Sequence, residues 1–299
     1  MEKHLAAAGR SSRNAQARFN AYRRAAEAIN VLGPDLFPLI TTAEEPISGT
    51  RPIVLPANSP RNADRYELNG IVDVISSVRL QEHQDNDLVA MLAEHLPDED
   101  EVFDVIVDYK GMRRPSRGVQ NDPIWDDHAW QIQTYAWLRS KREDRARVGC
   151  GLIIYLNELY PSRQDMKALR ADRENGTSDV LPPRGSADDY AILGVAANAD
   201  EDGDEPTDAA LSLAFRLERA VRVIGVDEQS QQNAVDRIHA VVEDIEERVS
   251  REHADGEIRN NWPANGRHRD CVACDFNDTC PQPAWVRDGL ARTPPRAPG

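Results

Sequence analysis

The sequence has few aromatic residues and no long apolar run, and each shortage excludes a class of protein. Only 6% of the 299 residues are aromatic, but 40% are hydrophobic and gather in periodic runs, which excludes a wholly disordered chain. No window approaches the roughly 18 consecutive apolar residues of a membrane span. Residues 1–16 contain charges and no apolar stretch, so we predict no secretory signal, no membrane partner and a cytoplasmic location.

Lysine is scarce as well. Four of the 36 basic residues are lysines, against 51 acidic residues and a net charge of −15. An acidic surface with few lysines is what we expect of a halophilic protein, because a Debye length of roughly 3 Å at 1 M salt screens self-repulsion. Local basic clusters therefore indicate more about partners than the net charge does.

Cysteine is rare and unevenly placed. Cys150 stands alone, whereas Cys271, Cys274 and Cys280 fall close together near the C-terminus. That spacing is typical of a metal or cluster site rather than of a disulfide framework. A G-x-x-x-x-G-K-[ST] segment is missing, so we predict that the chain has no ATP site of its own.

The periodic runs predict a mixed α/β fold, with helices on both sides of a central sheet. The predicted elements are helices over 13–32, 86–96, 124–142, 207–224 and 230–250, and strands over 66–80, 101–111 and 148–159. Between them we interpret a proline-rich segment over 34–60 as a connector and a polar, acidic segment over 160–205 as a loop excursion. The domains we expect are an N-terminal helix and connector (1–65), a core (66–260), and a cysteine module with a frayed tail (261–299).

The strongest chemical signal joins Asp73 to the segment Asp108-Tyr109-Lys110. Residues two apart on a strand share a face, so Asp108 and Lys110 project together. Charged side chains in an apolar strand are costly to bury without partners. Two carboxylates suit a hard divalent cation such as Mg²⁺ or Mn²⁺, and a lysine ammonium suits a water or a phosphate. The alternative is a plain salt bridge at the end of the strand.

The next helix contributes Gln131 and Tyr135, which are four apart and share a helix face. Three segments, Gly70-Ile71-Val72-Asp73, Val107-Asp108-Tyr109-Lys110 and Gln131 to Tyr135, follow in an order that resembles the RecB-like branch of the PD-(D/E)XK nucleases. The resemblance implies a restriction-endonuclease-like core with a mixed central sheet. It also implies catalytic roles for Asp73, Asp108, Lys110, Gln131 and Tyr135.

In that family the two acidic residues hold the metal, so the resemblance implies that Asp73 and Asp108 bind Mg²⁺ or Mn²⁺. Lys110 would activate the attacking water or stabilise the phosphate, and the glutamine and tyrosine would line the site. The upstream histidine of the family has no counterpart, since His4 is the only histidine before residue 83. The candidates to replace it are Glu27, Glu44 and Glu45.

The spacing Cys271-x2-Cys274-x5-Cys280, followed by Pro281, resembles the C-terminal part of the iron–sulfur module of RecB-like nucleases, which include CRISPR-associated exonucleases. The resemblance implies a [4Fe–4S] cluster, for which four thiolates are the usual complement. The family's N-terminal cysteine is missing, because no cysteine precedes Asp73.

Two residues compete for the fourth position. Cys150 is one candidate, although its apolar setting favours a buried, inert thiol. His268 is the other, and with the three C-terminal cysteines it would make a set that suits structural Zn²⁺.

Arg113, Arg114 and Arg117 follow Lys110 directly, and we predict that they contact the DNA backbone, since arginine binds phosphate well. The resemblance leads us to expect a metal-dependent DNA nuclease, an exonuclease on single-stranded ends, in DNA repair or CRISPR adaptation with a helicase or adaptation protein as partner. One alternative is a catalytically impaired, DNA-binding scaffold subunit. The other is a zinc-ribbon protein with an unrelated α/β domain.

Overall fold

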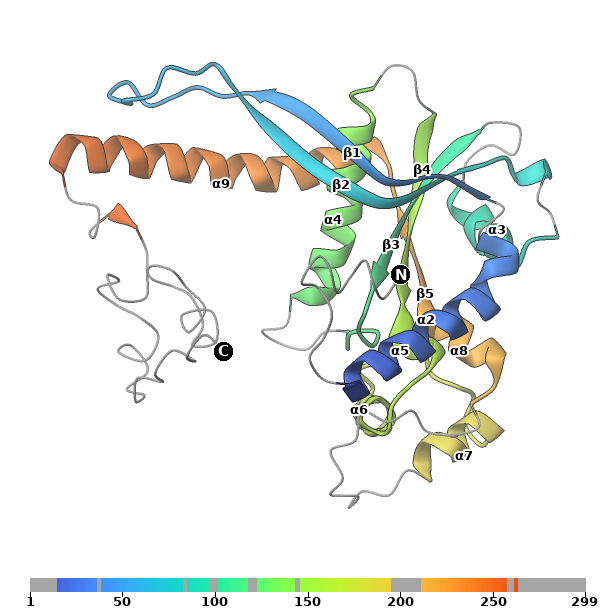
Figure 1. The fold of residues 1–299 in the computed structure, drawn as a ribbon. Helices are drawn as coiled ribbons and strands as arrows, with labels where there is room; N and C mark the ends of the chain where they lie inside the picture. The colour runs from blue at the N-terminus through green and yellow to red at the C-terminus, as the bar shows by residue number, and fades with distance from the viewer. Residues whose placement is uncertain are drawn as a thin grey trace, which may run out of the picture. The chain divides into compact units, whose positions relative to one another are not determined.

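The computed structural model describes residues 15–36, 39–82, 85–96, 102–117, 123–142, 146–194, 211–256 and 261–262. The chain forms two compact units. The first comprises residues 1–49 and 68–235 and contains most of the sheet, whose strands are labelled in Figure 1. The second comprises residues 50–67 and 236–299. All the residues of the candidate site that the structure describes belong to the first unit.

A single five-stranded sheet organises the first unit. Its strands are β1 (Ile40–Pro52), β2 (Arg65–Val78), β3 (Phe103–Lys110), β4 (Arg147–Tyr155) and β5 (Val221–Gly225), in the order β1-β2-β3-β4-β5. β2 runs antiparallel to β3, β3 parallel to β4, and β4 antiparallel to β5. A parallel pair needs a crossover connection, and the helix α4 (Ile124–Arg139) provides it between β3 and β4. The predicted mixed α/β class is thereby confirmed.

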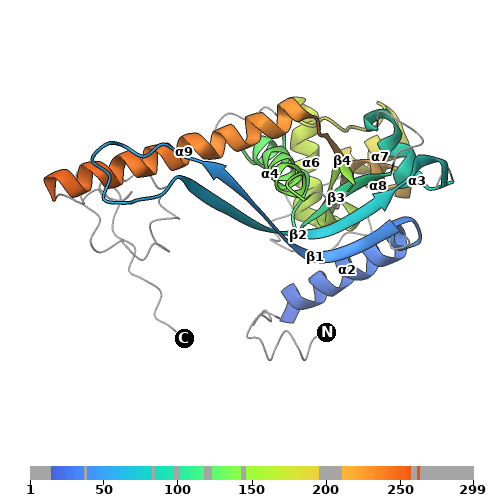
Figure 2. The same cartoon turned by 90° about the horizontal axis from the view of Figure 1, so that it is seen from above.

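Helices cover both faces of this sheet. The helices α2 (Ala15–Leu36), α3 (Asp87–Leu92) and α8 (Leu213–Ala220) pack on one face through a cluster that includes Val105, Val107 and Leu152. The helix α4 packs on the other face, against Ile106 and Ile153. Figure 2 shows α2 and α4 on opposite sides of the strands. The alternation of Val105, Ile106 and Val107 between the two clusters follows from the period of two in a strand.

Most predicted elements are confirmed. The strands predicted over 66–80 and 101–111 are β2 and β3, and the helices predicted over 13–32 and 124–142 are α2 and α4. The strand predicted over 148–159 is β4 only as far as Tyr155, because residues 156–159 form a short helix instead. The helix predicted over 86–96 is α3, which is followed by the short 3₁₀ helix η3 (Ala93–His95), and η2 (Leu80–Glu82) precedes it. The helix predicted over 230–250 is α9 (Glu228–Asp255).

The prediction of a connector over 34–60 is wrong for residues 40–52, which form β1. This strand contains Pro46 and Pro52, and proline has no N–H to donate to a ladder. β1 tolerates both prolines because it lies at the edge of the sheet. The proline content therefore concealed a strand.

The prediction of a loop excursion over 160–205 is also wrong in part. The segment contains α6 (Arg163–Asn175) and α7 (Ala187–Leu193), and the short helix α5 (Leu156–Leu159) precedes it. A capping box between Ser162 and Asp165 begins α6, and Gly176, with a φ of 67°, ends it. The helices α6 and α7 share a small apolar core with the start of α8 (Leu213–Ala220), and this core consists of Met166, Leu169, Ile192, Leu211 and Phe215.

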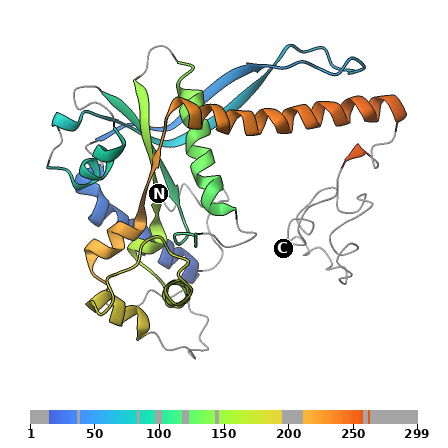
Figure 3. The ribbon, with the colours of Figure 1, turned by 180° about the vertical axis from the view of Figure 1, so that it is seen from behind.

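The helix predicted over 207–224 ends early. The helix α8 stops at Ala220, and the next residues, Val221–Gly225, form the edge strand β5, as Figure 3 shows from behind. The sequence places no glycine or proline between the two elements, and the usual signal for a boundary is therefore missing.

The second unit is held together by contacts between residues 50–67 and the part of α9 that begins at Asp236. Tyr66 stacks on His239 with ring centroids 5.7 Å apart, and its hydroxyl lies 3.1 Å from His239 Nδ1. Arg61 forms an ion pair of 2.6 Å with Glu246. No helix within the described ranges is long and apolar enough to cross a membrane.

Candidate functional site

Asp108 and Lys110 lie at the end of β3, on the face that α4 covers. Their side chains follow Ile106 at intervals of two, as predicted from the strand period. Lys110 Nζ lies 2.6 Å from Asp108 Oδ2. The side chain of Asp108 is 7% exposed and that of Lys110 is 18% exposed, so the pair is largely shielded from water.

Gln131 and Tyr135 extend this pair along α4. Lys110 Nζ donates a hydrogen bond of 2.7 Å to Gln131 Oε1, and Gln131 Nε2 donates one of 3.1 Å to the Tyr135 hydroxyl. The spacing of four residues places the glutamine and the tyrosine on one helix face. A continuous chain of polar contacts therefore runs from Asp108 through Lys110 and Gln131 to Tyr135.

Asp73 joins the site from β2. Its Oδ2 atom accepts a hydrogen bond of 3.0 Å from the backbone N–H of Tyr109, between the two charged residues of β3. Val72 and Val74 flank it and are two residues apart, yet they belong to the clusters on opposite faces of the sheet. The alternation of β2 is thus broken at Asp73, an irregularity of the kind that re-aims a side chain near a site.

The two carboxylates influence each other. Burial raises the pKa of Asp108, Lys110 opposes that shift, and the neighbouring charge of Asp73 adds to it. Burial, with the charge of Asp73 in second place, raises the pKa of Tyr109 to about 12. The site therefore holds two acidic groups in a setting that disfavours two negative charges unless a cation accompanies them.

These residues fit a divalent cation. Asp108 Oδ2 is buried and receives no aligned hydrogen bond from the described residues, although Lys110 Nζ lies beside it. Asp73 and Asp108 together exceed the charge of Lys110 by one negative charge. Mg²⁺ commonly takes one or two carboxylates and fills its other positions with waters and phosphate oxygens. Within the described ranges no set of three or more histidine, cysteine, aspartate or glutamate residues is grouped as a metal site would need.

Gly70 has no side chain and so leaves room for the ring of Tyr135. A Cβ atom at Gly70 would lie 2.9 Å from Tyr135 Cε1, and the ring occupies the space that a side chain would need. We expect Gly70→Ala to displace the ring and to lower any activity of the site by on the order of 10- to 100-fold, since such shifts misplace bound substrate. Gly111→Ala is the control, because no atom lies within 4 Å of its added Cβ. Equal activities of the two variants would contradict this prediction.

The three arginines predicted to contact DNA have different surroundings. Arg114 is 5% exposed, forms bonds of 2.9 and 2.6 Å to the Asp179 carboxylate, and donates to the carbonyls of Arg219 and Val221. Arg113 pairs with the carboxylate of Asp172. These two residues fasten the 160–194 segment to the core, and burial corrects the expectation that Arg114 is a surface contact.

Arg117 is exposed, and its backbone N–H donates a hydrogen bond of 2.7 Å to the carbonyl of Thr177. Contact between the Arg117 side chain and a phosphate therefore remains a prediction. The structure gives the charge of the neighbouring Arg113 an internal partner, so the basic cluster is weaker than its sequence indicates.

The glutamates considered as replacements for the missing histidine have other contacts. Glu45 pairs with Arg139 at 2.6 Å and with Arg142 at 3.0 Å, and Glu27 pairs with Arg216 at 2.9 Å. Arg139 also pairs with Asp104 at 2.7 Å. Glu44 is exposed on β1. These contacts make Glu45 part of a buried ionic network rather than a ligand beside Asp108.

Sequence reasoning missed a second polar group next to Lys110. Tyr155 is the register partner of Lys110 on β4, is fully buried, and has its hydroxyl 3.0 Å from His128 Nδ1 on α4. Burial raises the pKa of Tyr155, while a hydrogen bond from Arg222 opposes that shift. Tyr155 ends an apolar strand and lacks a motif of its own, so only the register of the parallel pair reveals its place.

Cys271, Cys274, Cys280 and His268 lie outside the described residues. Cys150 is a free thiol buried in β4, as its apolar setting predicted. Burial raises its pKa to about 12, so at pH 8 roughly one molecule in ten thousand carries the reactive thiolate.

We therefore expect iodoacetamide at pH 8 to leave Cys150 unmodified in the folded protein and to alkylate it fully in guanidinium chloride. Mass spectrometry of the peptide that contains Cys150 measures both states. Rapid alkylation without denaturant would contradict the burial of this thiol and would return it to the candidates for a cluster ligand.

Comparison with known proteins adds no identity. The chain matches no family model, no curated protein and no solved structure. One connected site in the structure consists of five residues predicted from three separate segments, which are Asp73, Asp108, Lys110, Gln131 and Tyr135.

Proposed function

We propose that this chain is a metal-dependent DNA nuclease of the RecB-like PD-(D/E)XK type. The observation that carries the proposal is the chain of contacts from Asp108 through Lys110 to Gln131 and Tyr135, with Asp73 beside it. The order of the three motifs along the chain supports the same conclusion. The mixed sheet, with α4 as the crossover between β3 and β4, gives a fold in which these motifs meet.

Charge balance supports a phosphodiester as substrate. Asp73 and Asp108 together exceed the charge of Lys110 by one negative charge, so a divalent cation leaves one net positive charge in the site. A phosphodiester group carries one negative charge and neutralises it. When bound, Mg²⁺ or Mn²⁺ would polarise a phosphate oxygen and stabilise the charge that develops during hydrolysis.

The residues of the chain have separate roles in this proposal. Asp73 and Asp108 would hold the cation, and the N–H of Tyr109 fixes the orientation of the Asp73 carboxylate. Lys110 Nζ would donate a hydrogen bond to the attacking water or to a non-bridging phosphate oxygen. Gln131 holds the ammonium at 2.7 Å, and Tyr135 in turn holds Gln131, so that the position of the lysine is fixed before substrate binds.

The experiment is digestion of end-labelled single-stranded DNA in high KCl with Mn²⁺, with EDTA, and with the variant Asp108→Asn. Asparagine keeps the size of the side chain and removes the charge that binds the cation. We expect shortened products only for the wild type with metal. Retention of activity in EDTA or in Asp108→Asn would overturn the proposal, and so would an inactive wild type that carries its full metal complement.

The three C-terminal cysteines belong to the same proposal as ligands of a [4Fe–4S] cluster, with Zn²⁺ as the alternative. A brown preparation that absorbs at about 400 nm indicates a cluster, and a colourless protein with one bound zinc indicates the structural Zn²⁺ site. The nuclease would act in the repair of DNA or in CRISPR adaptation and would depend on a partner for any helicase step, since the sequence has no ATP motif.

A further inference from the structure

Arg222 on β5 is a buried cation that forms no ion pair within the described ranges. Four arginines of those ranges are buried, and three of them pair with carboxylates, in the pairs Arg114–Asp179, Arg139–Asp104 and Arg219–Glu158. Arg222, which is 9% exposed, is the fourth. A buried charge costs free energy unless an opposite charge accompanies it, so Arg222 is a candidate for binding an anion.

The contacts that Arg222 makes are with neutral groups. Its Nη1 atom donates a hydrogen bond of 2.9 Å to the backbone carbonyl of Trp125, and its guanidinium carbon lies 3.4 Å from the centre of the Trp125 ring. Burial lowers the pKa of Arg222, while a hydrogen bond with the Tyr155 hydroxyl opposes that shift. These contacts hold the guanidinium in place and leave its charge without a counter-ion.

The surroundings of Arg222 contain one positive charge more than they contain negative charges. Asp179 accepts hydrogen bonds of 2.9 and 2.6 Å from Arg114, and its charge acts on Arg222 as well. The guanidinium of Arg114 lies over the same Trp125 ring, 5.5 Å from its centre. The two arginines therefore share one carboxylate, and a singly charged anion would balance the remaining charge.

Arg222 lies on the same face of the sheet as the candidate site. It is the register partner of Ile153 on β4, and Ile153 is the register partner of Asp108 on β3. Residues that are paired across neighbouring strands share a face of the sheet. Because neighbouring strands lie about 4.8 Å apart, the backbones of Arg222 and Asp108 are about 10 Å apart.

A row of polar contacts along α4 connects Arg222 with Lys110. The contacts come from three neighbouring strands and are Lys110 with Gln131, Tyr155 with His128, and Arg222 with Trp125. The three helix residues follow one another at intervals of three, so they lie along one face of α4. The acidic residues of the first turn, Asp126 and Asp127, are rotated from Trp125 by roughly 100° and 200° and lie off that face.

The guanidinium lies where α4 begins, at an open end of the contact between the helix and the sheet. Trp125 is the second residue of α4 and is half-buried, and Pro123 just before the helix is exposed. Ile132, further along α4, is fully buried. A ligand would therefore reach Arg222 from the beginning of the helix.

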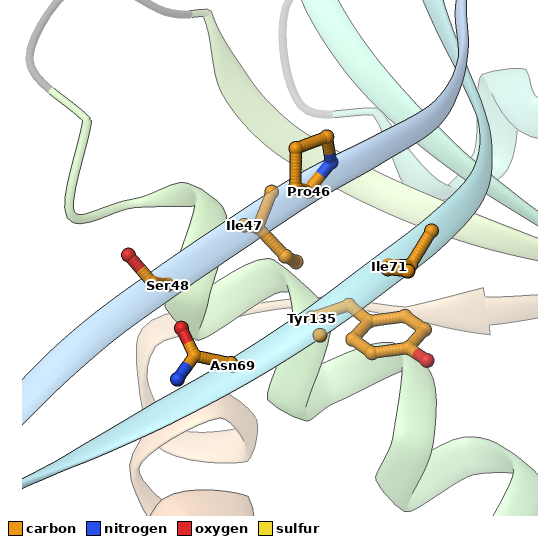
Figure 4. Close-up of a pocket in the computed structure, with 7 residues that line it drawn as sticks. Pro46, Ile47, Ser48, Asn69, Ile71 and Tyr135 are labelled. Carbon is orange, nitrogen blue, oxygen red and sulfur yellow. The ribbon is translucent and has the colours of Figure 1, made fainter.

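The depression drawn in Figure 4 lies elsewhere. It has a volume of about 640 Å³, and none of its lining residues carries a charge. Its exposed lining residues lie on the face of β1 and β2 opposite to the one that α4 covers, and they are Pro46, Ser48, Asn69 and Ile71. An anion would therefore find its partner at Arg222 and not in this depression.

We propose that Arg222 binds a phosphate of single-stranded DNA that neighbours the phosphate held at Lys110. The inference rests on the proposed nuclease function and adds a second phosphate contact to it. Arginine suits this role because its guanidinium stays charged when it is buried and donates several hydrogen bonds to phosphate oxygens. Arg113 and Arg114 have internal carboxylate partners, so Arg222 replaces part of the basic cluster that the sequence indicates.

The first experiment measures thermal unfolding in potassium phosphate and in potassium chloride at equal ionic strength, with inorganic phosphate as the probe. Arg222→Met removes the charge and keeps an apolar stem, and Arg222→Gln also keeps a donor for the Trp125 carbonyl. Arg147→Met is the control. Arg147 lies over the ring of Phe103 at the other end of β4 and also forms no ion pair within the described ranges.

We expect phosphate to raise the unfolding temperature of the wild type and of Arg147→Met by about 2–4 °C more than that of either Arg222 variant. Phosphate also stabilises proteins without binding to a site, and the Arg222 variants measure that part. A merely structural arginine would lower the unfolding temperature equally in both salts. An equal response of all four proteins to phosphate would therefore overturn the anion site.

The second experiment distinguishes a phosphate of DNA from a free anion. It measures equilibrium binding of a fluorescent single-stranded oligonucleotide in EDTA, where no cleavage takes place, over a range of KCl concentrations. Each phosphate contact contributes about 0.7 to the slope of log K against log [KCl]. We expect the Arg222 variants to lower the slope by about 0.7 and Arg147→Met to leave it unchanged. An unchanged slope in the Arg222 variants would overturn the assignment to DNA, even if their response to phosphate is lost.

The two experiments separate this site from the nuclease proposal. A wild type that shows both effects of Arg222 but cleaves no DNA would keep the site and overturn the nuclease. A wild type that cleaves DNA, with Arg222 variants that equal it in slope and in phosphate response, would keep the nuclease and overturn the site. A wild type that binds no oligonucleotide in EDTA would overturn the assignment of the anion to DNA.

Discussion

We expect Lys110→Ala to lower the rate of metal-dependent cleavage at least 10²- to 10³-fold below that of the wild type. Among the described residues, Lys110 is the only cationic side chain that forms an ion pair with Asp108. Its ammonium also donates a hydrogen bond of 2.7 Å to Gln131. Its loss removes both the hydrogen-bond donor to the phosphate and the charge that balances the two carboxylates. The measurement is the initial rate of product formation from end-labelled DNA at saturating Mn²⁺.

Lys167→Ala is the matched control. Lys167 is another of the four lysines of the chain, and it lies on α6, away from the contacts of the site. We expect it to cleave at the rate of the wild type. Thermal unfolding of both variants separates an effect on chemistry from an effect on stability. A Lys110→Ala variant that is folded and active within about three-fold of the wild type would refute the role of the lysine.

Arg139→Ala carries the largest expected effect on stability, a loss of about 3–5 kcal/mol in the free energy of unfolding. Arg139 is 2% exposed and pairs with Asp104 at 2.7 Å and with Glu45 at 2.6 Å. Asp104 is also 2% exposed, and removal of Arg139 takes away the cation that pairs with its buried carboxylate. Urea unfolding monitored by circular dichroism, at one fixed KCl concentration, measures the change.

Arg142→Ala provides the comparison within the same network. Arg142 contacts the same oxygen of Glu45 at 3.0 Å, but its side chain is 37% exposed. Solvent screens such a pair, and the expected loss is about 1 kcal/mol or less. Similar losses for the two variants would show that burial does not determine the strength of these ion pairs.

The parts of the fold that follow strand or helix periodicity could be predicted from the sequence. β3 is an apolar run that ends at a glycine, and α4 begins after Pro123, so both have clear limits. β1 was missed because Pro46 and Pro52 contradict strand propensity, and only an edge position removes the contradiction. The helix α6 was missed because it is strongly polar, so its composition resembles that of a loop although its few apolar residues have helical spacing.

The candidate site was predictable where it is local. The shared face of Asp108 and Lys110 follows from a period of two, and that of Gln131 and Tyr135 follows from a spacing of four. The approach of Asp73 depends on a break in strand alternation, which the sequence does not indicate. The burial of Arg114 depends on Asp179, 65 residues away, a long-range contact that composition and local spacing cannot predict.

The crossover from β3 through α4 to β4 has a consequence for the order of folding. Asp108, Lys110, Gln131 and Tyr135 all belong to this one continuous stretch, residues 103–155. Contacts between residues close in sequence close the smallest loops and are the first to become favourable. The partners of β2 and β3 are 25 to 33 residues apart (Val78 with Phe103, Val74 with Val107), whereas Phe103 and Arg147 of β3 and β4 are 44 apart and Ile154 and Val221 of β4 and β5 are 67 apart. We therefore expect β2 to bring the second carboxylate to the lysine before the sheet is complete. Nascent protein would then acquire its capacity to hold a divalent cation before β5 joins the sheet.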